Sequence, residues 1–344
     1  MVGKSLAVKH RPQKFSDLTE QSLIVTILEN MCKGGSELTN RNFLFIGPAG
    51  TGKTTSARIV GRMLNNGEDY AIEIDAASNG GVEDVRDIVK QAKTYPTVGK
   101  YKIFILDECH TFSDKAWQAL LLVLEEQPAR TVFIFCTTNP EKIPETILSR
   151  IQTFQLSKIS TQGIYSRLQH IIEQEKSEGR LIEADDAAIM FISKLANGGM
   201  RSAITMVDKA LAYNHVLSME NISSALNLPA YDDYFILLMA IAKKDNVTLA
   251  KLVHDVYNSG VNFVTWFERF HQFVINIVKF IFLKDITMTM IPSHYLEKIE
   301  HYNESHSTLC LRLADRLLKM NHQLKTTSYQ QELVLTYLSH TPQR

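Results

Sequence analysis

One short segment limits the fold of this chain more than any other. Four apolar residues, 43–46 (FLFI), run directly into residues 47–54 (GPAGTGKT), and the amphipathic pattern of residues 53–64 follows. The segment matches G-x-x-x-x-G-K-[ST] between an expected strand and an expected helix, which is the context that this motif requires. Its glycines let successive backbone N–H groups face one anion, and the helix adds the positive end of its dipole. The sequence therefore predicts a site for the phosphates of a nucleotide.

Further apolar runs of strand-forming residues alternate with helical patterns, at residues 71–74 (AIEI), 103–106 (IFIL) and 132–136 (VFIFC). Strands that alternate with helices such as 114–126 predict a mostly parallel sheet covered on both faces. Ligands of such sheets bind beyond the carboxyl ends of the strands. We therefore expect an α/β domain whose chemistry gathers at one edge of its sheet.

Two acids follow the expected strand at residues 103–106. Asp107 is placed to hold a magnesium ion together with the hydroxyl of Thr54, while Lys53 can reach the β- and γ-phosphates. Glu108, one residue further on, can orient a water and deprotonate it for attack on the γ-phosphate. This combination predicts nucleotide hydrolysis in addition to nucleotide binding.

The residues around these acids give weaker signals. Cys109 and His110 form a lone pair without further ligands, so we interpret them as packing or hydrogen-bonding residues. Thr138 follows the strand at 132–136 and would lie next to the γ-phosphate, although Thr-Asn-Pro is also a common turn. Arg201 begins an expected helix and, taken alone, would be an ordinary surface residue.

Length and composition narrow the remaining possibilities. A chain of 344 residues exceeds the size at which a single core stops growing, so two or three domains are expected. Lys plus Arg and Asp plus Glu both number 37, so binding to nucleic acid would need a local basic patch or an assembly. The four cysteines contain no C-x-x-C pair, which excludes the usual zinc modules and predicts reduced thiols in a cytoplasmic protein. No apolar run is long enough to span a membrane, and the opening is too basic for a secretory signal.

Helical patterns dominate after about residue 160. We expect four short helices at 164–178, 186–196, 201–213 and 219–226, followed by a longer helical tract towards the C-terminus. That tract carries an apolar stripe at three-to-four spacing, which is typical of a core or a subunit contact rather than a cofactor site. The stripe consists of Phe263, Trp266, Phe267, Phe270, Phe273 and Ile277.

Five segments together resemble the AAA+ ATPases and, within them, the clamp-loader subunits of the bacterial DNA polymerase III gamma/tau type. They match in order and spacing, densely over residues 6–215 and more thinly beyond. The segments are LAVKHRPQKFSDL (6–18), EIDAASNGGVEDVRDI (73–88), FILDECH (104–110), TTNPEKIPETILSR (137–150) and GGMRSAITMVDKAL (198–211). The resemblance implies an AAA+ parallel-sheet P-loop domain (1–158), a small helical lid (159–227) and an all-α collar domain for oligomerisation (228–344).

The resemblance also implies roles for individual residues. Catalysis would involve Glu108 and Asp107 of Walker B, Lys53 and Thr54 of Walker A, Thr138 as sensor 1, Arg201 as sensor 2 and Arg150 as the arginine finger. In clamp loaders this finger completes the ATP site of the neighbouring subunit, which makes hydrolysis depend on assembly. Metal binding would fall to Thr54 and Asp107. Nucleotide binding would involve Arg11, Pro12, Gly47, Pro48, Ala49, Gly50, Thr51, Gly52, Lys53, Thr54, Thr55 and Arg201.

The implied cofactors are ATP and Mg²⁺, without zinc, because only residues 65–69 fill the gap where the family carries its cysteine cluster. Ile151 also replaces the cysteine of the family's Ser-Arg-Cys motif. These departures are typical of a compact, phage-type or otherwise streamlined loader. The implied partners are a sliding clamp, other loader subunits in a pentamer, and primer–template DNA, with no membrane.

A possible DNA contact is suggested by Arg86, Lys90 and Lys93, which fall on one helical face. Such a face could contact phosphates without reading bases, or it could simply be a solvated basic stripe. Two other functions stay open at this point. One is a different AAA+ DNA motor such as a branch-migration helicase, and the other is a structural, stator-like subunit that binds ATP but barely hydrolyses it.

Overall fold

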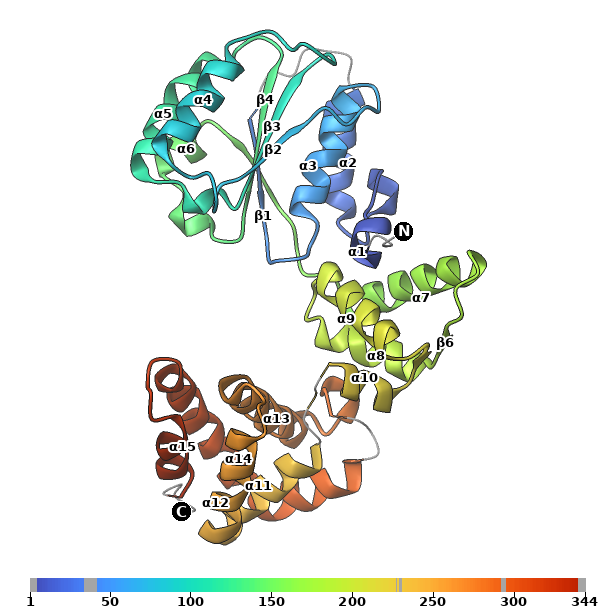
Figure 1. Cartoon of the computed structure of the whole chain (residues 1–344), viewed down its shortest axis with the longest axis vertical. Helices are drawn as coiled ribbons and strands as arrows, with labels where there is room; N and C mark the ends of the chain where they lie inside the picture. The colour runs from blue at the N-terminus through green and yellow to red at the C-terminus, as the bar shows by residue number, and fades with distance from the viewer. Residues whose placement is uncertain (1–4, 34–41, 227, 229–230, 292–294, 340–344) are drawn as a thin grey trace. The chain divides into compact units, whose positions relative to one another are not determined.

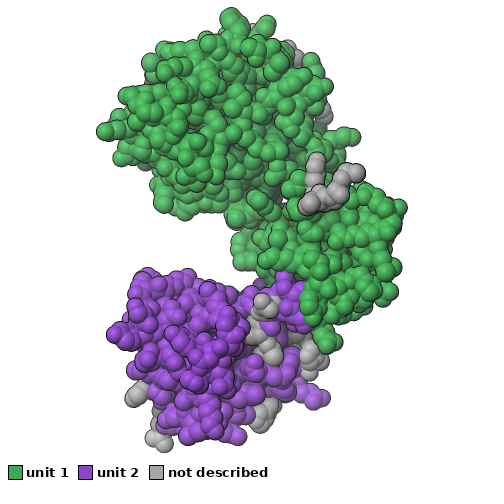
Figure 2. All heavy atoms as spheres, in the orientation of Figure 1, with its two compact units in different colours: residues 1–221 green, residues 222–344 purple. Residues whose placement is uncertain are grey.

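The computed structural model describes residues 5–33, 42–226, 228, 231–291 and 295–339. Residue 227, where the predicted lid ends, and the two ends of the chain lie outside this set. The chain forms two compact units, residues 1–221 and 222–344 (Figure 2). The first unit holds both the predicted P-loop domain and most of the predicted lid, so the division of these two into separate domains stays a prediction.

A five-stranded parallel sheet organises the first unit (Figure 1). Its order is β2-β3-β4-β1-β5, with every neighbouring pair parallel. The strands are β1 (Asn42–Ile46), β2 (Ile72–Asp75), β3 (Lys102–Asp107), β4 (Thr131–Thr137) and β5 (Gln152–Gln155). Four of the five were predicted within one or two residues. The fifth, β5, was not predicted, because Phe154 is its only buried residue and it therefore shows no apolar run.

Helices cover both faces of this sheet (Figure 1). One face packs against α4 and α5 through a core that includes Phe104, Phe133 and Trp117, and the other packs against α2 and α3 through Phe43, Phe45 and their neighbours. The helices of this part are α1 (Leu6–Lys9), α2 (Ser22–Lys33), α3 (Lys53–Leu64), α4 (Val82–Ala92), α5 (Asp114–Glu126) and α6 (Glu145–Leu148). Burial on both faces explains why the central strands read as continuous apolar runs.

The strand order brings the predicted chemistry to one edge of the sheet. Ile46 at the end of β1 lies opposite Thr137 at the end of β4, and β3 pairs with β4 on its other side. Because all strands are parallel, the segments that follow β1, β3 and β4 leave from the same edge. The phosphate loop, the two acids and the Thr-Asn-Pro turn therefore converge, as the sequence predicted.

A small helical region completes the first unit. It contains α7 (Thr161–Ser177), α8 (Asp186–Leu195) and α9 (Met200–Tyr213), and α10 (Met219–Ala225) begins at its end and runs into the second unit. These four helices lie close to the four predicted ones. It also contains a two-stranded parallel sheet that was not predicted, β6 (Glu183–Ala184) with β7 (Val216–Leu217). Two-residue strands are too short to show any periodicity. The result confirms the predicted α/β fold with helices after it.

The second unit is built from helices. They are α11 (Tyr231–Lys243), α12 (Asn246–Asn258), α13 (Phe263–Leu283), α14 (Leu296–Leu324) and α15 (Gln330–Ser339). The aromatic stripe of α13 lies at the centre of its core, where all six predicted stripe residues are at most 5% exposed. Among the described residues, no helix is both long and apolar enough to cross a bilayer.

Candidate nucleotide-binding site

The phosphate loop connects the end of β1 to the start of α3. Lys53, the first residue of α3, is buried, and its Nζ donates hydrogen bonds to the carbonyls of Gly47 at 2.9 Å and Pro48 at 3.0 Å. Thr51 Oγ1 donates to the same Pro48 carbonyl at 2.9 Å. These bonds curl the loop around the ammonium group, which has three donors in total. The loop thus holds a positive charge at the N-terminus of a helix, where an anion is favoured.

Gly50 joins this loop to the helical region. Its φ is +77°, and a side chain there would bring a Cβ to within 3.2 Å of Gly199 Cα. The Met200 N–H donates a hydrogen bond to the Gly50 carbonyl at 3.0 Å. Only a glycine combines this left-handed backbone with so close a neighbour. As a result, the start of α9, including Arg201, lies directly against the phosphate loop.

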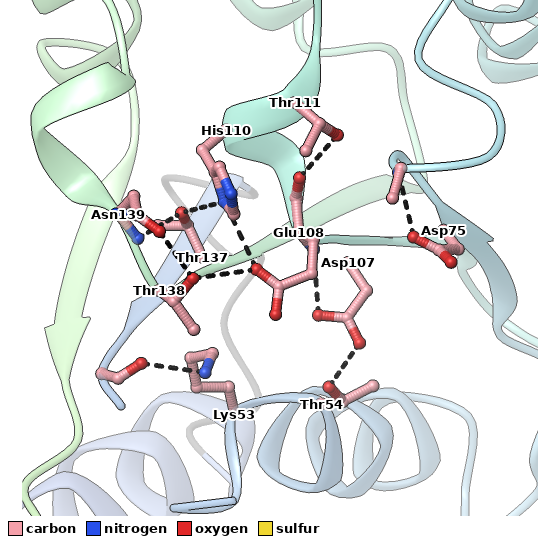
Figure 3. Close-up of polar contacts among 12 residues, drawn as sticks. Lys53, Thr54, Asp75, Asp107, Glu108, His110, Thr111, Thr137, Thr138 and Asn139 are labelled. Atoms are coloured by element: carbon pink, nitrogen blue, oxygen red, sulfur yellow. Dashed lines mark hydrogen bonds and ion pairs between the residues drawn. The ribbon is translucent and has the colours of Figure 1, made fainter. Parts of the chain in front are cut away.

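Thr54 and Asp107 form the pair that could hold a magnesium ion. Thr54 Oγ1 donates to Asp107 Oδ2 at 2.7 Å, which joins the first turn of α3 to the end of β3 (Figure 3). Both groups offer hard oxygen ligands, and Mg²⁺ usually needs only one or two of these from the protein beside phosphates and waters. The two residues therefore fit the ion. Among the described residues, no cluster of three or more His, Cys, Asp or Glu side chains could bind a metal by itself.

Glu108 follows Asp107 in a left-handed conformation, with φ of 46°. Its Oε2 lies 3.2 Å from Thr138 Oγ1 and 3.3 Å from His110 Nδ1 (Figure 3). His110 Nδ1 is also 3.1 Å from Thr137 Oγ1. The Glu108 carboxylate is thus contacted at Oε2 by one polar group from the residue that follows β4 and by one from the short 3₁₀ helix Cys109–Thr111. Cys109 is fully buried, and burial raises the pKa of its thiol, which agrees with the packing role predicted for it.

A cavity of about 380 Å³ connects these parts. It is bounded by the N-terminal segment, the phosphate loop, the end of β3, and helices α7 and α9. The predicted site residues that line it are Arg11, Pro12, Ala49, Gly50, Thr51, Gly52, Lys53, Thr54, Thr55, Asp107, Glu108 and Arg201. Gly47, Pro48 and Thr138 are not among the lining residues. The carbonyls of Gly47 and Pro48 accept hydrogen bonds from Lys53, and Thr138 contacts Glu108.

Sequence reasoning missed two features of this cavity. Arg167 on α7 lines it and donates to the His10 carbonyl at 3.3 Å, although an arginine within a helix gives no local signal of such a position. The second feature is the anchoring of the N-terminal segment to α7, where Glu175 contacts both His10 and Lys9 at 2.6 Å. Burial, and then the nearby charge of Arg58, lower the pKa of Arg11 in this wall of the cavity.

Arg150 lies outside the cavity, just after α6. Its Nε donates to Glu125 Oε1 at 2.8 Å, and Nη1 donates to the Thr146 carbonyl at 2.6 Å. Its acidic partner comes from α5, 25 residues earlier in the chain. The position of Arg150 away from its own cavity agrees with a role towards a neighbouring subunit, which stays a prediction.

The three basic residues predicted for DNA each have an acidic partner. Arg86 pairs with Glu83, Lys90 with Asp87 at 3.0 Å, and Lys93 with Glu126 at 3.0 Å. All three are solvent-exposed, and Lys93 falls just after the end of α4. Exposed pairs of this kind are weak and open readily. Binding of DNA by these residues stays a prediction.

The fold and the site define a P-loop protein of the AAA+ class. The solved structures of RuvB, the Holliday junction branch migration motor of Thermotoga maritima, superpose with a TM-score of 0.53. The match covers 67% of this chain and 79% of that one at 16% sequence identity, so it concerns the fold alone.

Sequence comparison identifies the family. The family model described as DNA polymerase III, delta subunit, matches residues 64–160. DNA polymerase III subunit gamma of Buchnera aphidicola subsp. Baizongia pistaciae is 31% identical over 87% of both chains. Subunit tau of Bacillus subtilis is 34% identical, and subunit gamma/tau of Mycoplasma genitalium is 31% identical. This chain belongs to the DNA polymerase III gamma/tau family. It spans about half the length of the latter two relatives, covering 44% and 53% of them.

Proposed function

We propose that this chain is an ATP-hydrolysing subunit of a sliding-clamp loader. The proposal is carried by one observation: Lys53, Thr54, Asp107 and Glu108 meet at a cavity that Arg201 of α9 also lines. Membership of the gamma/tau family, whose members are named as DNA polymerase III subunits, directs this ATPase site towards DNA replication.

The chain's own residues account for binding and activation. The loop N–H groups and Lys53 would bind the phosphates, and the N-terminal segment with Arg11 and Pro12 would form a wall for the nucleoside. Thr54 and Asp107 would hold a magnesium ion, which would supply positive charge to neutralise the phosphates. Glu108 would orient the attacking water and accept its proton. Arg201, on a helix that contacts the loop directly, would couple the γ-phosphate to the helical region.

We further propose that Arg150 completes the site of a neighbouring subunit. To do so it must leave Glu125, and both side chains are substantially exposed. Such a pair contributes about 0–1 kcal/mol. An arginine finger contributes a factor of roughly 10³–10⁵ in rate, which is about 4–7 kcal/mol. Releasing Arg150 from Glu125 would therefore cost much less than the transition-state stabilisation that a finger supplies, and the ion pair would hold the arginine until assembly.

In the loading cycle that we propose, the binding of ATP opens the clamp. Hydrolysis of ATP on primer–template DNA then releases the clamp. The implied partners are the sliding clamp and other loader subunits in a pentamer. The second unit, with its closely packed helical core, would serve as the oligomerisation domain.

Complementation between variants tests the trans arrangement. ATP hydrolysis is measured with primer–template DNA, the clamp and companion loader subunits for Lys53→Ala, for Arg150→Ala and for their mixture. Each variant alone should be nearly inactive, and the mixture should recover part of the activity. The control is Glu125→Ala, which removes the same ion pair but keeps the arginine, and it should stay active. Co-assembly without recovery would refute the trans role.

A structural, stator-like role is favoured by one observation, the pairing of Arg150 with Glu125. If that pair is permanent, the subunit binds ATP with little turnover, and Lys53→Ala should not change the ATPase rate of the assembly. A branch-migration motor, the other alternative, shares the fold of this chain. Strand unwinding without any clamp would identify it.

A further inference from the structure

The carboxylate of Glu108 is contacted on one side only. Both of its polar neighbours, Thr138 Oγ1 at 3.2 Å and His110 Nδ1 at 3.3 Å, face Oε2 (Figure 3). Among the described residues, none makes a hydrogen bond to Oε1. An ionised carboxylate can only accept hydrogen bonds, so the question is which neighbour supplies the proton to Oε2.

The hydroxyl of Thr138 donates its hydrogen bond to Asn139 and not to Glu108. It has a single proton, and Asn139 Oδ1 lies nearer to it, at 2.8 Å, than Glu108 does. The orientation of the Asn139 amide is fixed, because its Nδ2 donates to Glu141 Oε1 at 2.9 Å. A flipped amide would place its oxygen against the Glu141 carboxylate. The Thr138 proton therefore points to Asn139.

His110 is left as the donor to Glu108. Its neighbour Thr137 accepts the Asn139 N–H at 3.0 Å and lies 3.1 Å from His110 Nδ1. With a proton on Nδ1, the ring donates to Glu108 Oε2 and Thr137 Oγ1 together. With the proton on Nε2 alone, a bare ring nitrogen would face the carboxylate oxygen, which is unfavourable.

We propose that His110, protonated at Nδ1, is the positioning residue of Glu108. It holds Oε2, so that Oε1 stays available to the water that attacks the nucleotide. The left-handed backbone at Glu108 begins the 3₁₀ helix that carries His110 back over this carboxylate. The inference rests on the proposed function, in which Glu108 activates that water.

Three substitutions of His110 separate its hydrogen bond from its volume. Asn carries its amide nitrogen on Cγ, as histidine carries Nδ1, and Leu has the same shape as Asn without a donor. Gln places its donor one bond further out, near the position of Nε2. His110→Asn should keep most of kcat, whereas His110→Leu and His110→Gln should lose about 10- to 100-fold, because the base is misplaced. The dissociation constant for Mg²⁺-ATP should not change in any of them.

Equal turnover by the Asn and Leu variants would overturn the proposal, and so would a loss of nucleotide affinity that parallels the loss of kcat. A second measurement does not depend on turnover. In the full chain labelled with ¹⁵N-histidine, the His110 signal is assigned by its absence from the His110→Leu variant. Its shifts should show a protonated Nδ1, and protonation at Nε2 alone would refute the inference.

The same assay separates this inference from the proposed function. If Glu108→Gln hydrolyses ATP as fast as the unmodified chain, the proposed role of Glu108 fails, whatever the tautomer of His110. If Glu108→Gln is inactive but His110→Leu is fully active, the ATPase assignment stands and only the role of His110 fails.

Discussion

Glu175 on α7 accepts a hydrogen bond from His10 at 2.6 Å, and both side chains are only 6% exposed. The same carboxylate contacts Lys9 at 2.6 Å and Arg180 at 3.3 Å. Burial alone would raise the pKa of Glu175, but the hydrogen bonds from Lys9, His10 and Arg180 outweigh burial and lower it to about 2. One acid thus fastens the N-terminal wall of the nucleotide cavity to the helical region.

Stability should depend on pH through this acid. The folded pKa of about 2 lies below the ordinary 4.5, so the carboxylate stabilises the fold above pH 4.5 and loses this effect as the pH falls towards 2. Glu175→Gln should lower the free energy of unfolding by roughly 1–3 kcal/mol near pH 7, since two of its partners are partly exposed. The difference from the unmodified chain should shrink below pH 4.5.

Urea denaturation followed by Trp117 fluorescence measures this, in a Trp266→Phe background so that only the first unit reports. Glu178→Gln is the control, because Glu178 is an exposed partner of Lys9. It should change the free energy of unfolding by less than about 0.5 kcal/mol. A difference for Glu175→Gln that stays constant down to pH 3 would contradict the prediction.

The dependence of ATP affinity on magnesium should require the carboxylate of Asp107. Asp107→Asn keeps the shape of the side chain and can still accept from Thr54, but it lacks the charge that attracts a divalent cation. We expect it to weaken binding of ATP with Mg²⁺ by about tenfold or more, while binding in excess EDTA changes little. Titration with a fluorescent ATP analogue under both conditions is the measurement. Equal losses with and without the metal would mean that the substitution damages the loop instead.

Gly50 should be intolerant of a side chain for two separate reasons. Its φ of +77° disfavours any other residue, and an added Cβ would also press on Gly199 at 3.2 Å. Gly67 isolates the first reason, since its φ is +98° but nothing lies within 4 Å of an added Cβ. Gly67→Ala should cost about 1 kcal/mol in stability and leave nucleotide affinity intact. Gly50→Ala should cost more and reduce nucleotide affinity, and equal effects of the two would remove any special role from the contact with Gly199.

Trp266 should contribute to the stability of the second unit but not to the function of the first. It is 4% exposed, stacks on Phe270 and accepts, through its carbonyl, a hydrogen bond from Tyr234. Trp266→Ala should destabilise that unit by about 3–5 kcal/mol. ATP binding by the first unit should persist. In one preparation, calorimetry measures the loss of stability and nucleotide titration measures the affinity for ATP. Phe282→Ala, at a 68% exposed position on the same helix, is the matched control and should be nearly neutral.

Local patterns explain which parts of the fold were predictable. The four apolar strands, the helix that begins at Lys53 and the helices after residue 160 all leave a periodic signal within a few residues of themselves. Edge strand β5 leaves none, because it buries Phe154 alone and takes its partner from β1 more than a hundred residues away. The two-residue strands β6 and β7 are recognised as strands only because they pair with each other.

The same division applies to the site. The sequence by itself determined the phosphate loop, the adjacent acids and the sheet edge at which they meet, because each depends on a short motif and on the strand–helix alternation. Only the tertiary structure decided that Glu125 faces Arg150, that Glu175 holds His10, and that His110 lies beside Glu108 together with Thr137 and Thr138. Apart from the pair Glu108 and His110, these contacts join segments that are distant in the chain, and packing rather than local preference brings such segments together.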